Sequence, residues 1–200
     1  MLGETRHGDS TLAGVSDEQL IASVADGDPS CLATLFERHH RGVYQFCLQM
    51  TRNRALSEDL VQDVFLKLLK SARSFRNDGS FKAWMFNIAR NVTLDHLRKA
   101  KRQNNESMEQ AEVETALTDN RSAEQAAAGS QKMQRVMRAL AKLPAAAQEV
   151  IWLGRFEFDS YEELGQALSC NAGTARVRMH RAMQQLNSTY TRIYGASIDV

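Results

Sequence analysis

The chain has 200 residues, and its 25 Lys and Arg nearly balance its 24 Asp and Glu, which gives a formal net charge of +1 at pH 7. A length of 200 residues allows one domain or two small ones, and the presence of only two prolines favours helices. No apolar run reaches the roughly 18–20 residues of a membrane span, and the N-terminal stretch lacks the apolar core of a secretory signal, which argues against a membrane or secreted protein.

Three cysteines, Cys31, Cys47 and Cys170, are odd in number and scattered along the chain. They predict reduced thiols in a cytoplasmic protein and not a disulfide framework. A zinc site made of Cys31, Cys47, His39 and His40 is an alternative, but no CxxC or HxxxH spacing supports it. We therefore expect neither a metal nor another cofactor.

Four helices are expected in the first half of the chain. Ser16 and Gln19 have the spacing of a capping box, which starts a short helix that ends at the turn "DGDP". Hydrophobic periodicity then predicts the later helices and connections: helices over 30–50, 57–72 and 81–102, a loop at 51–57 and a turn at 73–80.

The last two of these helices have contrasting outer faces. The helix over 57–72 is acidic and polar on its outer side, whereas the helix over 81–102 is basic. From Lys82 to Arg102 there are six Lys and Arg and one Asp, a balance of +5. The buried stripe of this basic helix is expected to contain Phe81, Trp84, Met85, Ile88 and Val92. Its outward face is expected to show Lys82, Phe86, Asn87, Arg90, Asn91 and Arg98.

Residues 103–130 reverse the sign of the charge. Six Asp and Glu face one Arg, a balance of −5, and the stretch has no large aromatic residue. Such a segment buries too little surface to offset the entropy of ordering it. We expect a flexible acidic linker at 103–130 between two domains. The predicted divisions are an extension at 1–15, domains at 16–102 and 131–192, and a tail at 193–200.

The second domain is expected to hold four helices. Helices over 132–143 and 145–156, separated by Pro144, precede a short helix that Ser160 and Glu163 cap. The turn "SCN" then leads to a basic helix that begins after Asn171, a good N-cap. A short capped helix, a turn and a basic helix form the helix-turn-helix pattern. The predicted fold class is all-α, with two small helical domains.

The basic helix of this pattern lies in a stretch without acidic residues. Between Gly165 and Ile198 there are four arginines and no Asp or Glu, a balance of +4 in a chain whose total is +1. The major groove of DNA admits an α-helix, and arginine is the commonest reader of guanine edges there. The pattern indicates a polyanionic partner, and the alternative is an ordinary solvated basic face.

Three stretches together resemble bacterial sigma factors of the extracytoplasmic-function (ECF) group. They are "EDLVQDVFLKLLK", "GSFKAWMFNIARNVTLDHLRK" and, after the acidic gap, "LPAAAQEVIWLGRFEFDSYEELGQALSCNAGTARVRMHRAMQQL". The likeness covers roughly Asp17 to Tyr190. It implies a non-enzymatic subunit that binds core RNA polymerase, reads the −35 promoter element as duplex and reads the −10 element as a melted strand. No P-loop, GxSxG or HExxH motif supports an enzyme.

The resemblance also assigns roles to three groups of residues. For the −10 strand it implies a mixture of aromatic, basic and amide side chains, which suits unstacked bases and their backbone: Phe75, Arg76, Lys82, Phe86, Asn87, Arg90 and Asn91. The −35 contacts are Thr174, Arg176, Val177, Arg178, His180 and Arg181. The surface for the clamp helices of the largest polymerase subunit is Asp59, Gln62, Asp63 and Leu66. Alternatives are that Phe75 fills a helix junction and that the acidic surface is merely solvated.

The resemblance further implies partners and shows departures from the family pattern. Core polymerase, promoter DNA and an anti-sigma factor are the expected partners, with no membrane contact by the chain itself. Gly165 and Ser169 stand where the family usually has Ala and Gly, and a glycine within a helix should cost about 1 kcal/mol. Ala175 and Val177 replace a usual valine and a usual polar residue, so the preferred DNA sequence stays open.

A repressor or activator of the helix-turn-helix class is an alternative to a sigma factor. A helix-turn-helix repressor or activator would bind duplex operator without polymerase and would use its N-terminal helices to dimerise or to sense a ligand. Such helices have no need for the aromatic and basic residues between Phe75 and Arg90, or for a long acidic linker. These features favour the sigma factor.

Overall fold

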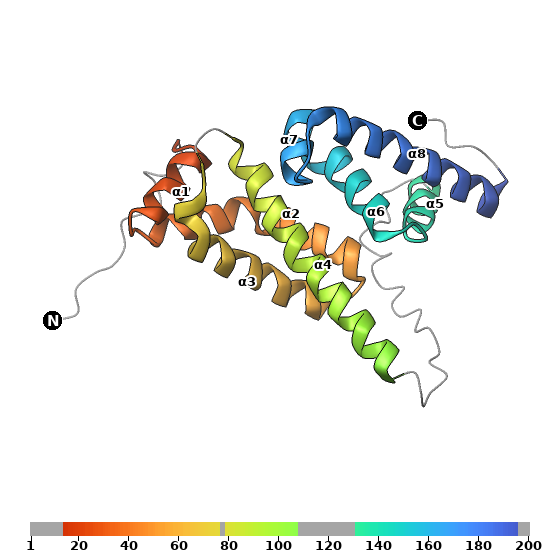
Figure 1. Cartoon of the computed structure of the whole chain (residues 1–200), viewed down its shortest axis with the longest axis horizontal. Helices are drawn as coiled ribbons and strands as arrows, with labels where there is room; N and C mark the ends of the chain where they lie inside the picture. Colours follow the sequence, from red (N-terminus) through yellow and green to blue (C-terminus); the bar gives the residue numbers. More distant parts are fainter. Residues whose placement is uncertain (1–13, 77–78, 108–130, 196–200) are drawn as a thin grey trace.

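The computed structural model describes residues 14–76, 79–107 and 131–195. Every regular element in these ranges is helical, and the helices form two modules, α1–α4 and α5–α8 (Figure 1). The predicted all-α class with two helical domains is confirmed. No helix in these ranges is long and apolar enough to cross a membrane.

The first module contains α1 (Asp17–Ala25), α2 (Ser30–Thr51), α3 (Arg54–Ser71), the 3₁₀ turn η1 (Ala72–Ser74) and α4 (Phe81–Ser107). The capping box of Ser16 and Gln19 is present. The predicted loop at 51–57 is wrong, because the Asn53 side chain accepts a hydrogen bond from the Leu56 amide and so starts α3 at Arg54. α4 continues past Arg102 into the predicted linker. The rest of that linker, 108–130, lies outside the described residues, as do 1–13 and 196–200.

The second module contains α5 (Gln131–Leu140), α6 (Ala145–Trp152), the π-helical turn η3 (Leu153–Glu157), α7 (Tyr161–Ala167) and α8 (Ala172–Tyr194). Ser160 caps α7 by accepting from the Glu163 amide, and Asn171 caps α8 by accepting from the Thr174 amide at 2.7 Å. α7, the turn and α8 therefore form the predicted helix-turn-helix.

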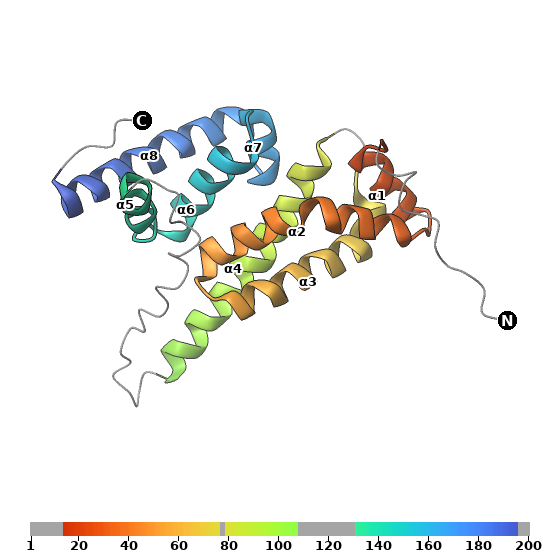
Figure 2. The same ribbon diagram turned by 180° about the vertical axis from the view of Figure 1, so that it is seen from behind.

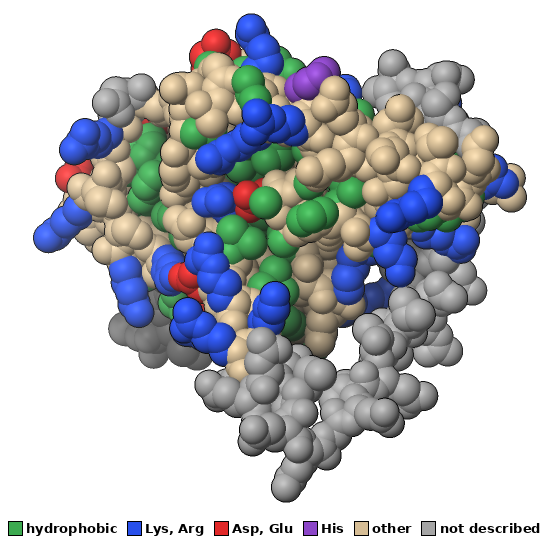
Figure 3. All heavy atoms as spheres, turned by 45° about the vertical axis from the view of Figure 1, so that its right-hand side comes forward, with side chains coloured by type: hydrophobic (Ala, Val, Ile, Leu, Met, Phe, Trp, Pro, Cys, Tyr) green, Lys and Arg blue, Asp and Glu red, His purple; other side chains and the backbone are tan. Residues whose placement is uncertain are grey.

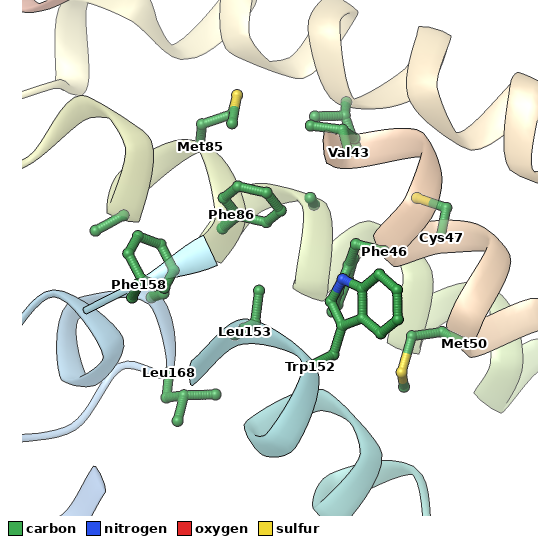
Figure 4. Packing of buried hydrophobic residues seen from close by; sticks show 14 of the residues in the cluster. Val43, Phe46, Cys47, Met50, Met85, Phe86, Trp152, Leu153, Phe158 and Leu168 are labelled. Atoms are coloured by element: carbon green, nitrogen blue, oxygen red, sulfur yellow. The ribbon is translucent and has the colours of Figure 1, made fainter. Parts of the chain in front are cut away.

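The two modules pack against each other, with α4 against α7 and α2 against α6 (Figure 2). Phe86 of α4 lies between Phe46 of α2, with ring centroids 6.1 Å apart, and Phe158, at 5.7 Å, in edge-to-face arrangements (Figure 4). Such aromatic pairs contribute about 0.5–1.5 kcal/mol beyond the surface they bury. Leu153 and Trp152 of the second module enter the same cluster.

This packing corrects the prediction that Phe86 faces outward. Phe86 is 0% exposed because the second module covers the side of α4 that the first module leaves open. α4 is therefore buried on two sides, which one stripe of apolar residues cannot indicate. Two members of the predicted stripe, Trp84 and Ile88, are only half-buried.

Candidate nucleic-acid interface

The outer side of α8 carries a cationic surface, here called the α8 face: Arg176, Val177, Arg178, His180 and Arg181. All five are exposed, and the apolar Val177 keeps 49% of its surface. The residues that alternate with them at helical spacing are buried in the module, among them Ala175, Met179 and Ala182. Thr174, the sixth residue predicted for this contact, is half-buried at the start of the helix.

Within the described ranges, none of the ion pairs involves an arginine of the α8 face. The charge of Arg178 nevertheless acts on the buried Glu149 and opposes the rise in the pKa of that carboxyl. Arg176 instead lies over the Tyr161 ring of α7, 5.1 Å from its centroid, and His180 is 3.0 Å from Gln184. In Figure 3, Lys and Arg side chains spread over the visible side of the molecule with few Asp and Glu among them. Such a surface attracts phosphate groups.

The turn before α8 explains the unusual residues at 165 and 169. The Cys170 amide donates to the Gly165 carbonyl at 2.8 Å, and a Cβ on Gly165 would lie 2.7 Å from the Cys170 carbonyl oxygen. Ser169 adopts a left-handed conformation with φ 54°, a region that favours glycine. The close approach of the turn to α7 therefore requires glycine at 165, and Ser169 takes the left-handed position.

The outer side of α4 carries a second polar surface, here called the α4 face: Lys82, Asn87, Arg90 and Asn91. Unlike the α8 face, it meets the second module. Lys82 Nζ lies 3.0 Å from Glu157 Oε2 and donates to the Glu157 carbonyl at 2.6 Å. Arg90 Nε donates to Glu149 Oε2 at 2.9 Å. Three of the four residues are half-buried, and Asn91 is exposed.

Asn87 joins the α4 face to the helix-turn-helix itself. Its Nδ2 donates to the Ala167 carbonyl at 3.0 Å and to Ser169 Oγ at 2.6 Å, and its Oδ1 accepts from Asn91 at 3.2 Å. Gln166 of α7 adds a contact from its Oε1 to the Ser80 amide at 3.3 Å. The same turn therefore positions α8 and holds α4.

Glu149 is a buried acid on α6 that no sequence pattern predicts. It is 3% exposed, and burial raises the pKa of its carboxyl, while the hydrogen bond and charge of Arg90 oppose the rise. The carboxylate therefore occupies this site at an electrostatic cost that Arg90 only partly offsets. In the sequence it follows Gln148 within the otherwise apolar α6, and no motif surrounds it.

Phe75 and Arg76 lie at the junction between η1 and α4. The Phe75 ring is half-buried, 5.2 Å from the Trp84 ring and 6.2 Å from the Phe81 ring, and Arg76 is exposed. Phe75 therefore fills a helix junction and still presents part of its ring to solvent.

The residues predicted to contact polymerase share one side of α3, here called the α3 face: Asp59, Gln62, Asp63 and Leu66. All four are exposed, and Leu66 keeps 52% of its surface. Leu69, also exposed, follows on the same helix, and the exposed Phe36 of α2 contacts Phe65 edge to face at 4.9 Å. An acidic helix side with exposed apolar residues suits a basic helical partner.

The four residues considered for a zinc site do not converge. His39 Nε2 is 2.6 Å from Asp17, His40 Nδ1 is 2.8 Å from the Phe36 carbonyl, and Cys47 Sγ is 3.5 Å from Thr93. No group of three or more potential ligands comes together in the described part of the chain. Burial raises the pKa of the Cys47 thiol to about 11, so it stays protonated at neutral pH.

Two family descriptions match the chain. Sigma-70 region 2 matches residues 35–103, and Sigma-70 region 4 matches residues 133–186. The first range lies in the α1–α4 module and the second in the α5–α8 module.

Curated relatives match over most of their length. The RNA polymerase sigma factor CarQ of Myxococcus xanthus is 31% identical over 80% of this chain and 90% of its own. The ECF RNA polymerase sigma factor SigE of Mycolicibacterium smegmatis is 30% identical over 89% of this chain and 70% of its own.

Solved structures share the fold. The sigma factor RpoE from Bartonella quintana, solved in complex with the anti-sigma factor NepR, is 28% identical with a TM-score of 0.62, over 78% of this chain and 94% of that one. CnrH, solved with the cytosolic domain of CnrY, has a TM-score of 0.64 at 24% identity, over 86% and 95%.

Proposed function

The chain belongs to the ECF group of RNA polymerase sigma factors, non-catalytic subunits that direct transcription initiation, and from this premise we propose how its two modules divide the reading of a promoter. The second module reads the −35 element as duplex through the α8 face. The first module reads the −10 element as a separated strand through the α4 face, with Phe75 and Arg76. The α3 face binds core polymerase.

The observation that carries this proposal is the α8 face on a helix-turn-helix. Its three arginines are exposed and form no ion pair in the described ranges, and α8 begins at the Asn171 cap. A helix of this kind enters the major groove with its N-terminal residues toward the bases. Val177, at 49% exposure, fits contact with a thymine methyl group.

The α4 face supports the second part of the proposal by its chemistry. Separated DNA needs cations for the backbone and planar or amide groups for the bases, and each stacking contact contributes about 1–3 kcal/mol. Lys82 and Arg90 supply cations, and Asn87 and Asn91 supply amides. The exposed part of the Phe75 ring supplies a surface beside Arg76 on which a base can stack.

Binding of core polymerase and of an anti-sigma factor completes the proposal. The exposed acids and Leu66 of the α3 face suit the clamp helices of the largest subunit. RpoE of Bartonella quintana was solved with the anti-sigma factor NepR, and we extend this type of partner to the present chain. The repressor hypothesis is dropped, because both family matches and the relatives are sigma factors.

Transcription in vitro tests the proposal. The chain is mixed with core polymerase and a library of genomic fragments, and the start sites that depend on it define the promoter elements. On such a promoter, Asn91→Ala and Phe75→Ala should reduce initiation, and a template with a pre-melted −10 segment should restore part of the Phe75→Ala loss. Tight operator binding without polymerase, and no start sites with it, would contradict the proposal.

A further inference from the structure

We propose that Tyr161 of α7 is a positioning residue for the −35 contact, because its ring supports the Arg176 guanidinium on the neighbouring helix and keeps that side chain oriented for DNA. The inference rests on the proposed function of the α8 face. It adds a residue that acts through another side chain and concerns how an exposed arginine is ordered before DNA is bound.

The geometry of the pair is that of a cation over an aromatic ring. The Arg176 Cζ atom lies 5.1 Å from the centroid of the Tyr161 ring, within the roughly 6 Å over which such a contact is favourable. Arg176 is exposed, whereas Tyr161 is half-buried and packs against the apolar core. The ring is therefore fixed by the module and can restrain the exposed side chain that lies over it.

The backbone is anchored on both sides of the pair. Tyr161 is the first residue of α7, directly after Ser160, whose side chain accepts from the Glu163 amide at 3.2 Å. Arg176 follows Ala175, which is 0% exposed, and α7 packs against α8 (Figure 1). The helix-turn-helix itself therefore sets the distance between the ring and the guanidinium.

This kind of contact leaves the hydrogen-bonding groups of Arg176 available. Arg176 forms no ion pair in the described ranges. A carboxylate would occupy the N–H groups in the plane of the guanidinium, whereas a ring face attracts the cation without accepting from them. Tyr161 therefore orders the side chain and leaves its donors for a guanine edge or a phosphate.

Restraint of Arg176 should strengthen its contact with DNA, because a long side chain loses rotamer freedom when it is immobilised in a complex. Part of that loss already occurs in the free chain when a ring restrains the guanidinium. Arg178 and Arg181 of the same face lie over no aromatic ring in the described ranges. Tyr161 should therefore strengthen one arginine contact and not the general attraction of the α8 face for DNA.

A double-mutant cycle in the complex with core polymerase tests the pair. Fluorescence anisotropy of labelled promoter DNA measures the affinity of complexes that contain the full chain as Tyr161→Leu, Arg176→Ala or both. Tyr161→Leu should weaken promoter binding about fivefold, the effect of losing an exposed cation–π contact. With Arg176→Ala already present, the same change should alter the affinity by less than about twofold. Equal losses in both backgrounds would overturn the inference.

A conservative variant separates the ring of Tyr161 from its hydroxyl group. Tyr161→Phe keeps the ring and should bind the promoter within about twofold of the wild type. If Tyr161→Phe lost as much affinity as Tyr161→Leu, the hydroxyl group and not the ring would be responsible, and the inference would be wrong.

Tyr194→Leu is the matched control for stability of the module. Tyr194 is also half-buried and also lies under a cation, since Arg135 is 5.5 Å from the centroid of its ring, but it stands at the other end of α8. This variant should leave promoter binding unchanged. A loss equal to that of Tyr161→Leu would assign both effects to loosening of the module and would overturn the inference.

The base preference gives a readout that a purely structural role of Tyr161 would not change. Affinity is compared across promoters in which each position of the −35 element is substituted in turn. The profile of Tyr161→Leu should follow that of Arg176→Ala at smaller amplitude, and a loss of preference at different positions would contradict the pairing.

The outcomes distinguish this inference from the proposed function. Normal promoter binding by Tyr161→Leu, together with a loss in Arg176→Ala, would overturn the inference and leave the proposed −35 contact intact. Normal binding by Arg176→Ala would refute the proposed contact of that arginine and the inference with it.

Discussion

The α4 and α8 faces carry similar side chains but differ in what lies against them. Both combine arginines or lysines with polar residues on the outer side of a helix. The α8 face is exposed and forms no ion pair in the described ranges. The α4 face, in contrast, meets two carboxylates and three other hydrogen-bond acceptors of the second module. A basic helix face therefore becomes a binding surface only where the rest of the fold leaves it open.

The largest effect on transcription is expected from substitutions on the α8 face. Replacing Arg176 and Arg181 with Ala should lower transcription from a −35-dependent promoter about a hundredfold, since each good arginine–base pair contributes about 1–3 kcal/mol. Transcription in vitro with core polymerase measures the loss. Arg192→Ala, on the last turn of the same helix, serves as the control and should have little effect. Loss of core binding by the double variant would show that the α8 face does more than read DNA.

The turn that joins the two faces is expected to give the next largest effect. Gly165→Ala forces a Cβ to within 2.7 Å of the Cys170 carbonyl oxygen, and such overpacking costs about 1–3 kcal/mol. Helix propensity alone predicts the opposite sign, a gain of about 1 kcal/mol. The free energy of unfolding in urea, followed by circular dichroism, decides between them.

Gly173→Ala is the matched control for that turn. A Cβ at Gly173 meets only Asn171 Oδ1, at 3.4 Å, so this variant should match or exceed the wild type in stability. If both variants were stabilising, the close approach of the turn to α7 would be wrong.

Most of the fold could be predicted from the sequence, because the signals that mark helices are local. The caps at Ser16, Ser160 and Asn171 and the apolar periodicity each act over a few residues, and all three caps are found in the structure. The cap at Asn53 is not predicted, because the polar stretch "TRNRALS" around it shows no apolar periodicity that would mark the start of a helix. The basic residues of the α8 face are visible in the sequence for the same local reason, because they lie in a stretch without Asp or Glu, and their role in binding DNA stays a prediction.

The sequence contains no comparable signal that the second module covers the α4 face. Glu149 and Glu157 lie more than fifty residues from the cations they meet, and nothing in their spacing links them to Lys82 or Arg90. Phe86 was placed outside because its position on the helix is opposite to the main apolar stripe. Only the packing of α4 against α7 shows that both sides of that helix are buried.

The first module also has an exposed face, the α3 face, whose four residues the second module leaves exposed. Asp63→Lys on the exposed α3 face should weaken binding of core polymerase about tenfold by placing a like charge against a basic partner. Titration of labelled protein with core polymerase measures the affinity. Glu162→Lys, the same change of charge on α7, should bind normally. An equal loss in both variants would assign the effect to net charge and not to the α3 face.

The smallest effect is expected at the α4 face, where Glu149 should make the free energy of unfolding depend on pH. Because burial raises the pKa of Glu149 in the folded chain, the neutral carboxyl is favoured there over the unfolded chain. The stability that this group contributes is full below its ordinary pKa of 4.5 and is lost as the pH rises through the higher folded value. Glu149→Gln lacks this titration and keeps an acceptor for Arg90.

The free energy of unfolding of the wild type, minus that of Glu149→Gln, should therefore decline as the pH rises from about 4.5 toward 7, with Glu162→Gln as the control for loss of one carboxylate. A difference that stays flat or grows with pH would mean that Arg90 outweighs burial and that the carboxylate stabilises the contact at neutral pH. A decline would mean that the α4 face is covered at an electrostatic cost near neutral pH. The α8 face forms no ion pair with a buried acid in the described ranges, and it acts on Glu149 only through the charge of Arg178.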